Sequence, residues 1–238
     1  MKKTLLTAIA SAFLFFGAEA QISTPQPSPA GSVFTKVGLT DVTIDYYRPS
    51  MKGRKIFGEG GDYLQPYGQL WRAGANSGTK LTLSTDAMIA GKEVKAGEYL
   101  IFLTPGKDEF KFMLYSDLSI GGNVGAYDKS KEVLAAGAKA SSNSSAVETL
   151  TYQITDLSAD NTSAHIQMAW ENVSVKVPIK VSFDEQVMAD IKAKTQVNPT
   201  NYLAAANYYY TSDKDLDQAL EWVNMYLAAG ENSKQFWN

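Results

Sequence analysis

The stretch YLIFLTPGKDEFKFMLY, residues 99–115, decides how this chain folds. Tyr99–Leu103 is a continuous apolar run, and the Pro105-Gly106-Lys107-Asp108 segment after it is a turn signal. In the run that follows, Met113 and Tyr115 are as apolar as their neighbours Phe112 and Leu114. Because successive side chains of a strand point to opposite faces, this strand is expected to be buried on both faces. The stretch predicts strands in the interior of a β-protein.

The same rhythm extends in both directions, from Ser32 to about Phe183. Apolar and polar residues alternate around Ile44, Leu81, Ile166 and Val175, and turn signals such as Ala90-Gly91-Lys92 separate the runs. Short strands at this spacing, with no helical pattern between them, are typical of an antiparallel β-sandwich or barrel. We therefore expect residues 32–183 to form one β-sandwich domain, in a fold that is mainly β with an α-helical tail.

Two segments interrupt this rhythm. Pro49–Gly68 is rich in Gly, Lys and Tyr and is too long for a hairpin turn, and Leu118–Tyr127 contains three glycines. Loops of this length in a compact domain are usually functional or disordered.

After Phe183 the apolar period becomes helical, which predicts a helical tail over residues 184–238. Ser182 and Glu185 have the spacing of a capping box, and Asn198-Pro199 has that of an N-cap followed by a first-turn proline. Two apolar stripes follow, one through Leu203, Ala206 and Tyr210 and one through Leu216, Ala219, Leu220, Val223 and Leu227. This helical hairpin resembles one tetratricopeptide repeat. A single repeat cannot bury its own face, so we expect the tail to pack on the sandwich, on a partner or on a further helix starting near Phe236-Trp237.

The first twenty residues have the pattern of a signal peptide. Lys2 and Lys3 precede the apolar run Leu5–Phe16, which is too short to span a bilayer, and Ala18-Glu19-Ala20 presents small residues where a signal peptidase cleaves. We expect an exported protein, periplasmic or extracellular, that begins near Gln21 with a flexible lead over residues 21–31. No later apolar stretch is long enough for a transmembrane segment.

Composition narrows the chemistry. The chain has no cysteine, which removes disulfides, thiolate metal sites and cysteine nucleophiles. Its net charge of -3 argues against nucleic acid as a partner, because proteins that bind phosphate backbones usually carry a basic excess. We expect no cofactor and no metal site.

The arginines are the most informative residues. Nineteen lysines are spread over the whole chain, but the three arginines, Arg48, Arg54 and Arg72, all fall between two of the expected strands. Arginine offers a planar fork of donors that recognises carboxylates and phosphates and stacks on aromatic rings. Such a group predicts a site for a carboxylate, phosphate or sugar. Alternatively, the arginines fasten a long loop to the sandwich through buried carbonyls and carboxylates. The candidate binding residues are Arg48, Arg54, Tyr67, Trp71, Arg72 and Asn76.

Arg72 is expected to oppose Trp71 across an extended segment. Trp71 would then enter the core, and Arg72 would face the Pro49–Gly68 loop, where Arg48 and Arg54 also lie.

These segments also carry a resemblance. The motifs Arg48-Pro49, Lys52-Gly53-Arg54-Lys55-Ile56-Phe57-Gly58 and Pro66-Tyr67-Gly68-Gln69-Leu70-Trp71-Arg72-Ala73-Gly74-Ala75-Asn76, with Ala96-Gly97-Glu98-Tyr99 and Trp170-Glu171, resemble a family of exported bacterial proteins, domain of unknown function 2911. The resemblance covers roughly residues 28–181. Where that family usually has an acidic residue and then Ala-Thr after the Asn, this chain has Ser77-Gly78-Thr79. The resemblance implies a fold and no activity.

No catalytic constellation stands out. His165 is the only histidine and lies on the polar phase of a strand, and no nucleophile motif accompanies it. Two function classes remain. The first is a binding or interaction module for a small molecule, a glycan or an envelope protein, with its site at the Arg/Trp/Asn segment. The second is a hydrolase acting on a cell-envelope carbohydrate or peptide, which would combine that segment with a carboxylate such as Asp62 or Glu98.

Overall fold

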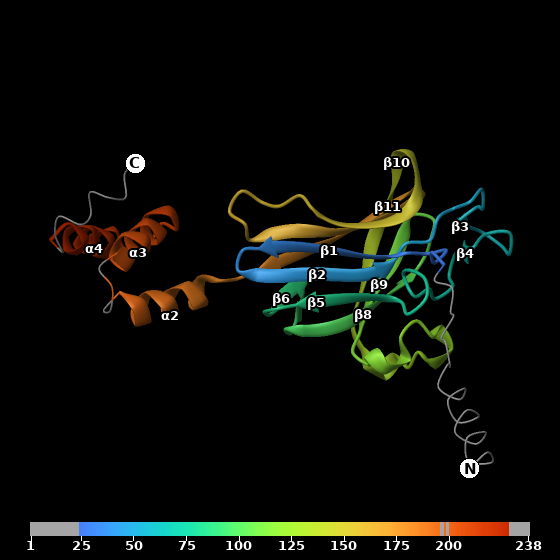
Figure 1. The fold of residues 1–238 in the computed structure, drawn as a ribbon, viewed down its shortest axis with the longest axis horizontal. Coiled ribbons are helices and arrows are strands. Elements are labelled where there is room, and N and C mark those ends of the chain that lie inside the picture. Colours follow the sequence, from blue (N-terminus) through green and yellow to red (C-terminus); the bar gives the residue numbers. More distant parts are fainter. Residues whose placement is uncertain (1–23, 196–197, 199, 229–238) are drawn as a thin grey trace, which may run out of the picture.

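The computed structural model describes residues 24–195, 198 and 200–228. The expected signal peptide, residues 1–20, and the expected further helix near Phe236-Trp237 lie outside these residues. The eleven strands of the described part are β1 (Ala30–Val37), β2 (Thr40–Tyr47), β3 (Phe57–Gly58), β4 (Gln65–Pro66), β5 (Thr79–Leu83), β6 (Ala87–Ile89), β7 (Lys92–Val94), β8 (Gly97–Thr104), β9 (Glu109–Tyr115), β10 (Glu132–Thr155) and β11 (Ser163–Val181). The tail holds α2 (Asp184–Lys194), α3 (Thr200–Thr211) and α4 (Leu216–Ala228). The expectation of a mainly antiparallel β fold with C-terminal helices is confirmed (Figure 1).

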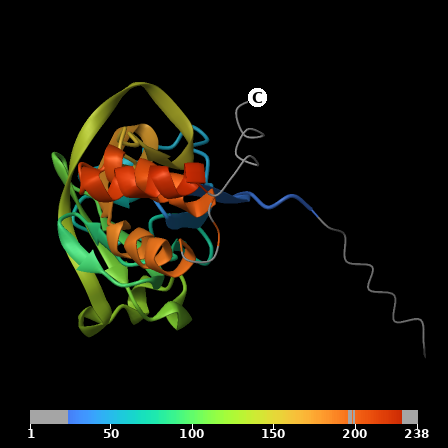
Figure 2. The same cartoon turned by 90° about the vertical axis from the view of Figure 1, so that its left-hand side faces the viewer.

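Nine strands form one antiparallel sheet in the order β1-β2-β5-β8-β9-β10-β11-β6-β7. The 24-residue strand β10 joins its two halves, because residues 132–139 pair with β9 and residues 140–155 pair with β11. Register shifts after Ser142 and after Val147 interrupt the second pairing, and such irregularities bend a strand. The sheet therefore folds over on itself, and the sandwich is made from one continuous sheet (Figures 1 and 2).

The core lies between the two halves. Ile44 on β2, Leu81 on β5 and Ile101 on β8 are buried in one cluster with Trp170 and Ile179 on β11. On the outer side of β8 and β9 a second cluster contains Leu100, Phe102, Met113 and Tyr115. It is covered by the segment that holds the short helices η2 (Leu118–Ile120), η3 (Val124–Ala126) and η4 (Lys129–Lys131). The prediction that the strand around Met113 is buried on both faces is thus confirmed.

Strand β1 begins earlier than expected. Ala30 and Gly31 pair with Tyr47 and Tyr46, so the last two residues of the expected lead, residues 21–31, belong to the sheet. Their pairing partners lie seventeen and fifteen residues later in the chain, and the short alternating pattern of β1 does not mark its own start.

The three helices lie beyond the end of β11, away from the sheet (Figure 1). Helices α3 and α4 pack on each other, with Ala206 and Ala219 buried and the Tyr209 and Trp222 rings 4.7 Å apart. Asp184 at the start of α2 accepts a hydrogen bond from the Tyr208 hydroxyl at 2.6 Å and pairs with Lys214 at 2.8 Å. The tail is therefore internally connected, while the resemblance to a tetratricopeptide repeat stays a prediction.

The two expected helix caps differ in outcome. The capping box is wrong, because the N-cap of α2 is Phe183 and no side chain caps that helix. Asn198 does accept hydrogen bonds from the amide and hydroxyl of Thr200 at the start of α3. No helix in the described part of the chain is long and apolar enough to cross a membrane.

Candidate functional site

All three arginines lie on the long connection between β2 and β5, and Trp71 fastens this connection to the sheet. The Trp71 amide donates to the Leu103 carbonyl at 2.7 Å, and the Leu103 amide donates back at 2.9 Å. The Trp71 indole is buried and stacks on Trp170 with ring centres 5.8 Å apart, and Phe57 from the same connection packs edge-on against both. The expectation that Trp71 enters the core is confirmed, and burial of rings of this size is a large source of stability.

A strained turn follows Trp71. Ala73 and Asn76 both have a left-handed backbone, with φ of 57° and 51°. The buried Ala73 carbonyl accepts hydrogen bonds from the Thr79 hydroxyl at 2.8 Å and from the Tyr152 hydroxyl at 2.9 Å. The Trp71 indole N–H donates to Gly74 at 3.1 Å. Non-glycine residues keep such a conformation only where the surroundings enforce it, and they concentrate at functional sites.

Arg72 and Arg54 line one cavity beside this turn. The cavity has a volume of about 390 Å³, and its walls include Trp71, Asn76 and Trp170. Arg72 is half-buried and donates from Nη1 to the Asn76 carbonyl at 2.9 Å. Arg54 is exposed and donates from Nε to the Met51 carbonyl at 2.9 Å and from Nη2 to the Ser50 carbonyl at 2.7 Å. Both guanidinium groups are thus oriented by backbone carbonyls and keep N–H groups free of these bonds.

The other two candidate residues have different surroundings. Arg48 lies against β10, where Nε is 3.4 Å from the Leu150 carbonyl and Nη2 is 3.4 Å from the Thr151 hydroxyl. Tyr67 is half-buried and packs against the core, and its burial raises the pKa of its phenol. Neither residue lines the cavity. Four of the six candidates, Arg54, Trp71, Arg72 and Asn76, therefore meet at one cavity.

The arginines carry charge without a carboxylate partner. Every ion pair found among residues 24–195, 198 and 200–228 uses a lysine or His165 as the basic group. The walls of the arginine cavity contain no Asp or Glu. The alternative in which the arginines fasten the loop describes Arg48 well. Arg54 and Arg72 also bond to carbonyls, but both residues line a cavity as well.

Two acids that sequence reasoning did not assign to this task also fasten the loop. Glu171 has a left-handed backbone, and its carboxylate accepts the amides of Ile56 at 3.2 Å and Phe57 at 3.4 Å. Glu148 accepts the Lys52 amide at 2.9 Å. The Trp170-Glu171 motif was the available signal, but its pairing with residues more than one hundred positions away is not visible in a sequence.

The acids considered for a hydrolase do not join the arginines. Glu98 pairs with Lys80 at 2.6 Å, which lowers the pKa of its carboxyl, and Asp62 is exposed on the loop. Neither lines the arginine cavity. Within the described residues no three His, Asp or Glu side chains form a group that could hold a metal ion.

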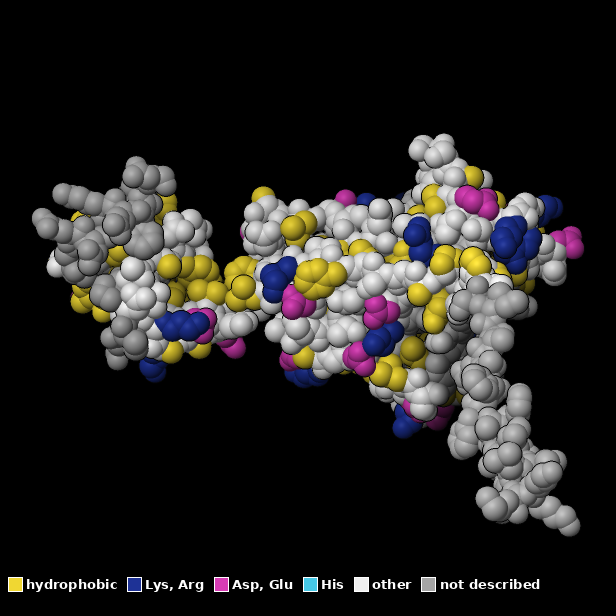
Figure 3. Space-filling model, in the orientation of Figure 1, with side chains coloured by type: hydrophobic (Ala, Val, Ile, Leu, Met, Phe, Trp, Pro, Cys, Tyr) yellow, Lys and Arg dark blue, Asp and Glu magenta, His cyan; other side chains and the backbone are white. Residues whose placement is uncertain are grey.

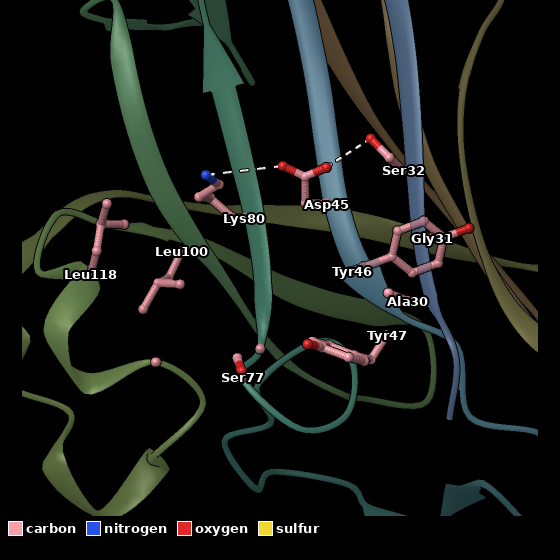
Figure 4. Close-up of a pocket in the computed structure, with 12 residues that line it drawn as sticks. Ala30, Gly31, Ser32, Asp45, Tyr46, Tyr47, Ser77, Lys80, Leu100 and Leu118 are labelled. Carbon is pink, nitrogen blue, oxygen red and sulfur yellow. Dashed lines mark hydrogen bonds and ion pairs between the residues drawn. The ribbon is translucent and has the colours of Figure 1, made fainter. Parts of the chain in front are cut away.

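A larger cleft of about 620 Å³ is lined by other residues of the β domain (Figure 4). Its walls include Ser32, Asp45, Tyr47, Ser77, Lys80, Leu100 and Leu118. Sequence reasoning missed this cleft, because Asp45, Tyr47 and Lys80 occupy the outward positions of ordinary alternating strands.

No curated protein and no solved structure matches the chain. The family model for proteins of unknown function (DUF2911) matches residues 28–179, which include every residue that lines the arginine cavity and the cleft. On that match over more than half of its length, the chain belongs to the DUF2911 family.

Proposed function

We propose that this protein is an exported binding module whose arginine cavity takes a small anionic ligand through a carboxylate or phosphate group. One observation carries the proposal: Arg54 and Arg72 line a cavity with no acidic residue in its walls. The pattern of the first twenty residues supports export.

The donor count supports an anion. A guanidinium group has five N–H donors. The bonds described above use two on Arg54 and one on Arg72. The remaining donors match the paired oxygens of a carboxylate or phosphate, which arginine binds in a bidentate manner. The Asn76 side-chain amide donates to the Ser28 carbonyl at 3.4 Å, which ties this wall to the chain before β1.

The size of the cavity supports a small ligand. Trp71 and Trp170 reach the cavity from the core, and a volume of about 390 Å³ is in the lower part of the range for small-molecule sites. Its walls combine polar groups, among them both arginines and Asn76, with apolar side chains, which suits a small ligand that carries a charged group. The residues around it supply no acid or base for hydrolysis, so we propose binding and not catalysis.

The test is calorimetric titration of the purified protein with glucuronate, succinate and inorganic phosphate. Arg72→Lys and Arg54→Lys keep the charge but remove the fork, and each is expected to weaken anion binding by about 1–3 kcal/mol. Arg48→Lys is the matched control, since Arg48 lies outside the cavity. The proposal is wrong if no anion binds, or if Arg48→Lys weakens binding as much as Arg72→Lys does.

A further inference from the structure

The larger cleft has the surface of a site for an uncharged, hydroxyl-rich ligand. Asp45 on β2, Lys80 on β5 and Leu100 on β8 line it, and Leu118 lies next to Leu100 at one side (Figure 4). Asp45 accepts a hydrogen bond from the Ser32 hydroxyl at 2.7 Å, and Lys80 lies 3.9 Å from Asp45 and 2.6 Å from Glu98. Lys80 is thus paired with Glu98 and lies near Asp45, so its positive charge is offset by two carboxylates.

This chemistry matches a sugar ring. A sugar presents apolar C–H faces and a rim of hydroxyl groups. Tyr47 and Leu118 offer apolar surface, while Asp45 offers acceptors and Lys80 and Ser77 offer donors. A second anionic group is disfavoured here, because Asp45 and Glu98 flank Lys80 and repel negative charge.

The two cavities adjoin along three segments of the chain. Residues 28–32, 75–78 and 118–124 each contribute to both: Ser28, Asn76 and Val124 line the arginine cavity, while Ala30, Ser77 and Leu118 line the cleft. These segments are in close contact with one another. A Cβ atom added at Gly122 would lie 2.6 Å from the Asn76 carbonyl oxygen, and one at Gly78 would lie 3.3 Å from the Gly121 carbonyl oxygen. Asn76 of the arginine cavity and Ser77 of the cleft are consecutive residues, so the two cavities adjoin at this point.

We propose that the two cavities form one groove for a glycan in which a carboxylated sugar is linked to neutral sugars. The carboxylate lies at Arg54 and Arg72, and the adjoining neutral sugar lies in the cleft between Tyr47, Asp45 and Lys80. This inference rests on the proposed function, because it takes the arginine cavity as the anion site and names the class of ligand.

The test compares acidic sugars with and without a neutral extension. The protein is titrated separately with glucuronate and with aldotriouronic acid, in which glucuronic acid is linked to two xylose units. A second pair of titrations uses N-acetylneuraminate and sialyllactose. For at least one pair, the extended glycan should bind at least ten-fold more tightly than the acidic sugar alone. Xylotriose and lactose, which lack the carboxylate, should bind far more weakly than the extended acidic glycans.

Variants separate the two parts of the groove. Tyr47→Ala and Asp45→Asn should remove the gain from the extension and leave the affinity for the acidic sugar unchanged, whereas Arg72→Lys should weaken both. Tyr210→Ala and Asp62→Asn are the matched controls, since both residues lie outside the groove, and unfolding curves check that each variant is folded.

The outcomes distinguish this inference from the function on which it rests. If acidic sugars or phosphate bind through Arg72 but neither pair shows a gain, the shared groove is refuted and the anion site stands. If a gain is seen but survives Tyr47→Ala and Asp45→Asn together, the placement in the cleft is refuted. If no anion binds at all, both proposals fail.

Discussion

Replacing Gly122 tests how closely the segment around it must approach the turn at Asn76. A Cβ atom there would lie 2.6 Å from the Asn76 carbonyl oxygen and 2.7 Å from Arg72 Cδ. We expect Gly122→Ala to displace the strained turn and to weaken anion binding at least ten-fold, with a loss of about 1–3 kcal/mol in unfolding free energy. Gly61→Ala is the control, because an added Cβ there meets nothing within 4 Å and φ is not left-handed. Equal binding by the two variants would contradict this account.

At the level of single residues, the sequence predicted part of the candidate site. Alternation along an extended segment indicated that Trp71 enters the core, and the scarcity of arginine marked Arg54 and Arg72. Arg48 belongs to the same short stretch, but its side chain reaches Leu150 and Thr151 and so takes no part in the cavity. That partner lies about a hundred residues further along the chain, and no local pattern can reveal it.

At the level of elements, the contact that joins the start of α2 to the rest of the tail should depend on pH. Hydrogen bonds from Lys214 and then from Tyr208 lower the pKa of the Asp184 carboxyl from its ordinary value of 3.8. A lowered pKa stabilises the folded tail above pH 3.8, and this contribution is lost as the pH falls through the lowered value.

We therefore expect hydrogen exchange in α2 and α3 to accelerate below pH 3.8 relative to exchange in β11. Asp184→Asn should show the faster exchange already at neutral pH. Asp190→Asn is the control, because Asp190 forms only an exposed pair with Lys194 on the same helix. Acid-independent protection of α2 in the unmodified protein would show that this contact does not hold the tail together.

The same element shows why a capping pattern can mislead. Ser182 and Glu185 have the correct spacing, but the chain enters α2 through Phe183, which packs against the core beside Gly38. Burial of an aromatic ring outweighs one hydrogen bond to a cap. Strand and helix types were predictable from period, whereas the shared use of β10 by both halves of the sheet was not, because nothing in its composition marks where its pairing partner changes.

For the whole molecule, the stability of the sheet should not depend on the helices. The hydrogen bonds and ion pairs of the described helices stay within the tail, apart from its covalent link to β11. A chain that ends after Phe183 should therefore keep the thermal midpoint of the β domain. A chain that ends after Val181 should unfold at a lower temperature, because without Phe183 it loses about 1–3 kcal/mol of apolar burial. Calorimetry of the two truncations and the full chain provides the measurement.

We expected the tail to pack within the chain or on a partner. In the described residues its helices pack on one another. Hydrophobic side chains remain at its surface (Figure 3), and Tyr210 and Leu220 are 72% and 59% exposed. Packing on a partner stays a prediction. Rapid exchange throughout α3 and α4 in the isolated protein would contradict even the internal packing.

The pairing of β6 with the end of β11 has a consequence for the order in which the chain folds. Ile89 pairs with Ile179, so this contact waits until almost the whole domain has been synthesised. Hairpins such as β1-β2, β8-β9 and β6-β7 close over short loops and can form during translation. The free edge of β6, however, has no neighbour until β11 emerges from the ribosome. During that interval Ile89 is exposed at a sheet edge, where nascent chains are prone to associate. We therefore expect chaperones to bind the nascent chain mainly at β6 and β7.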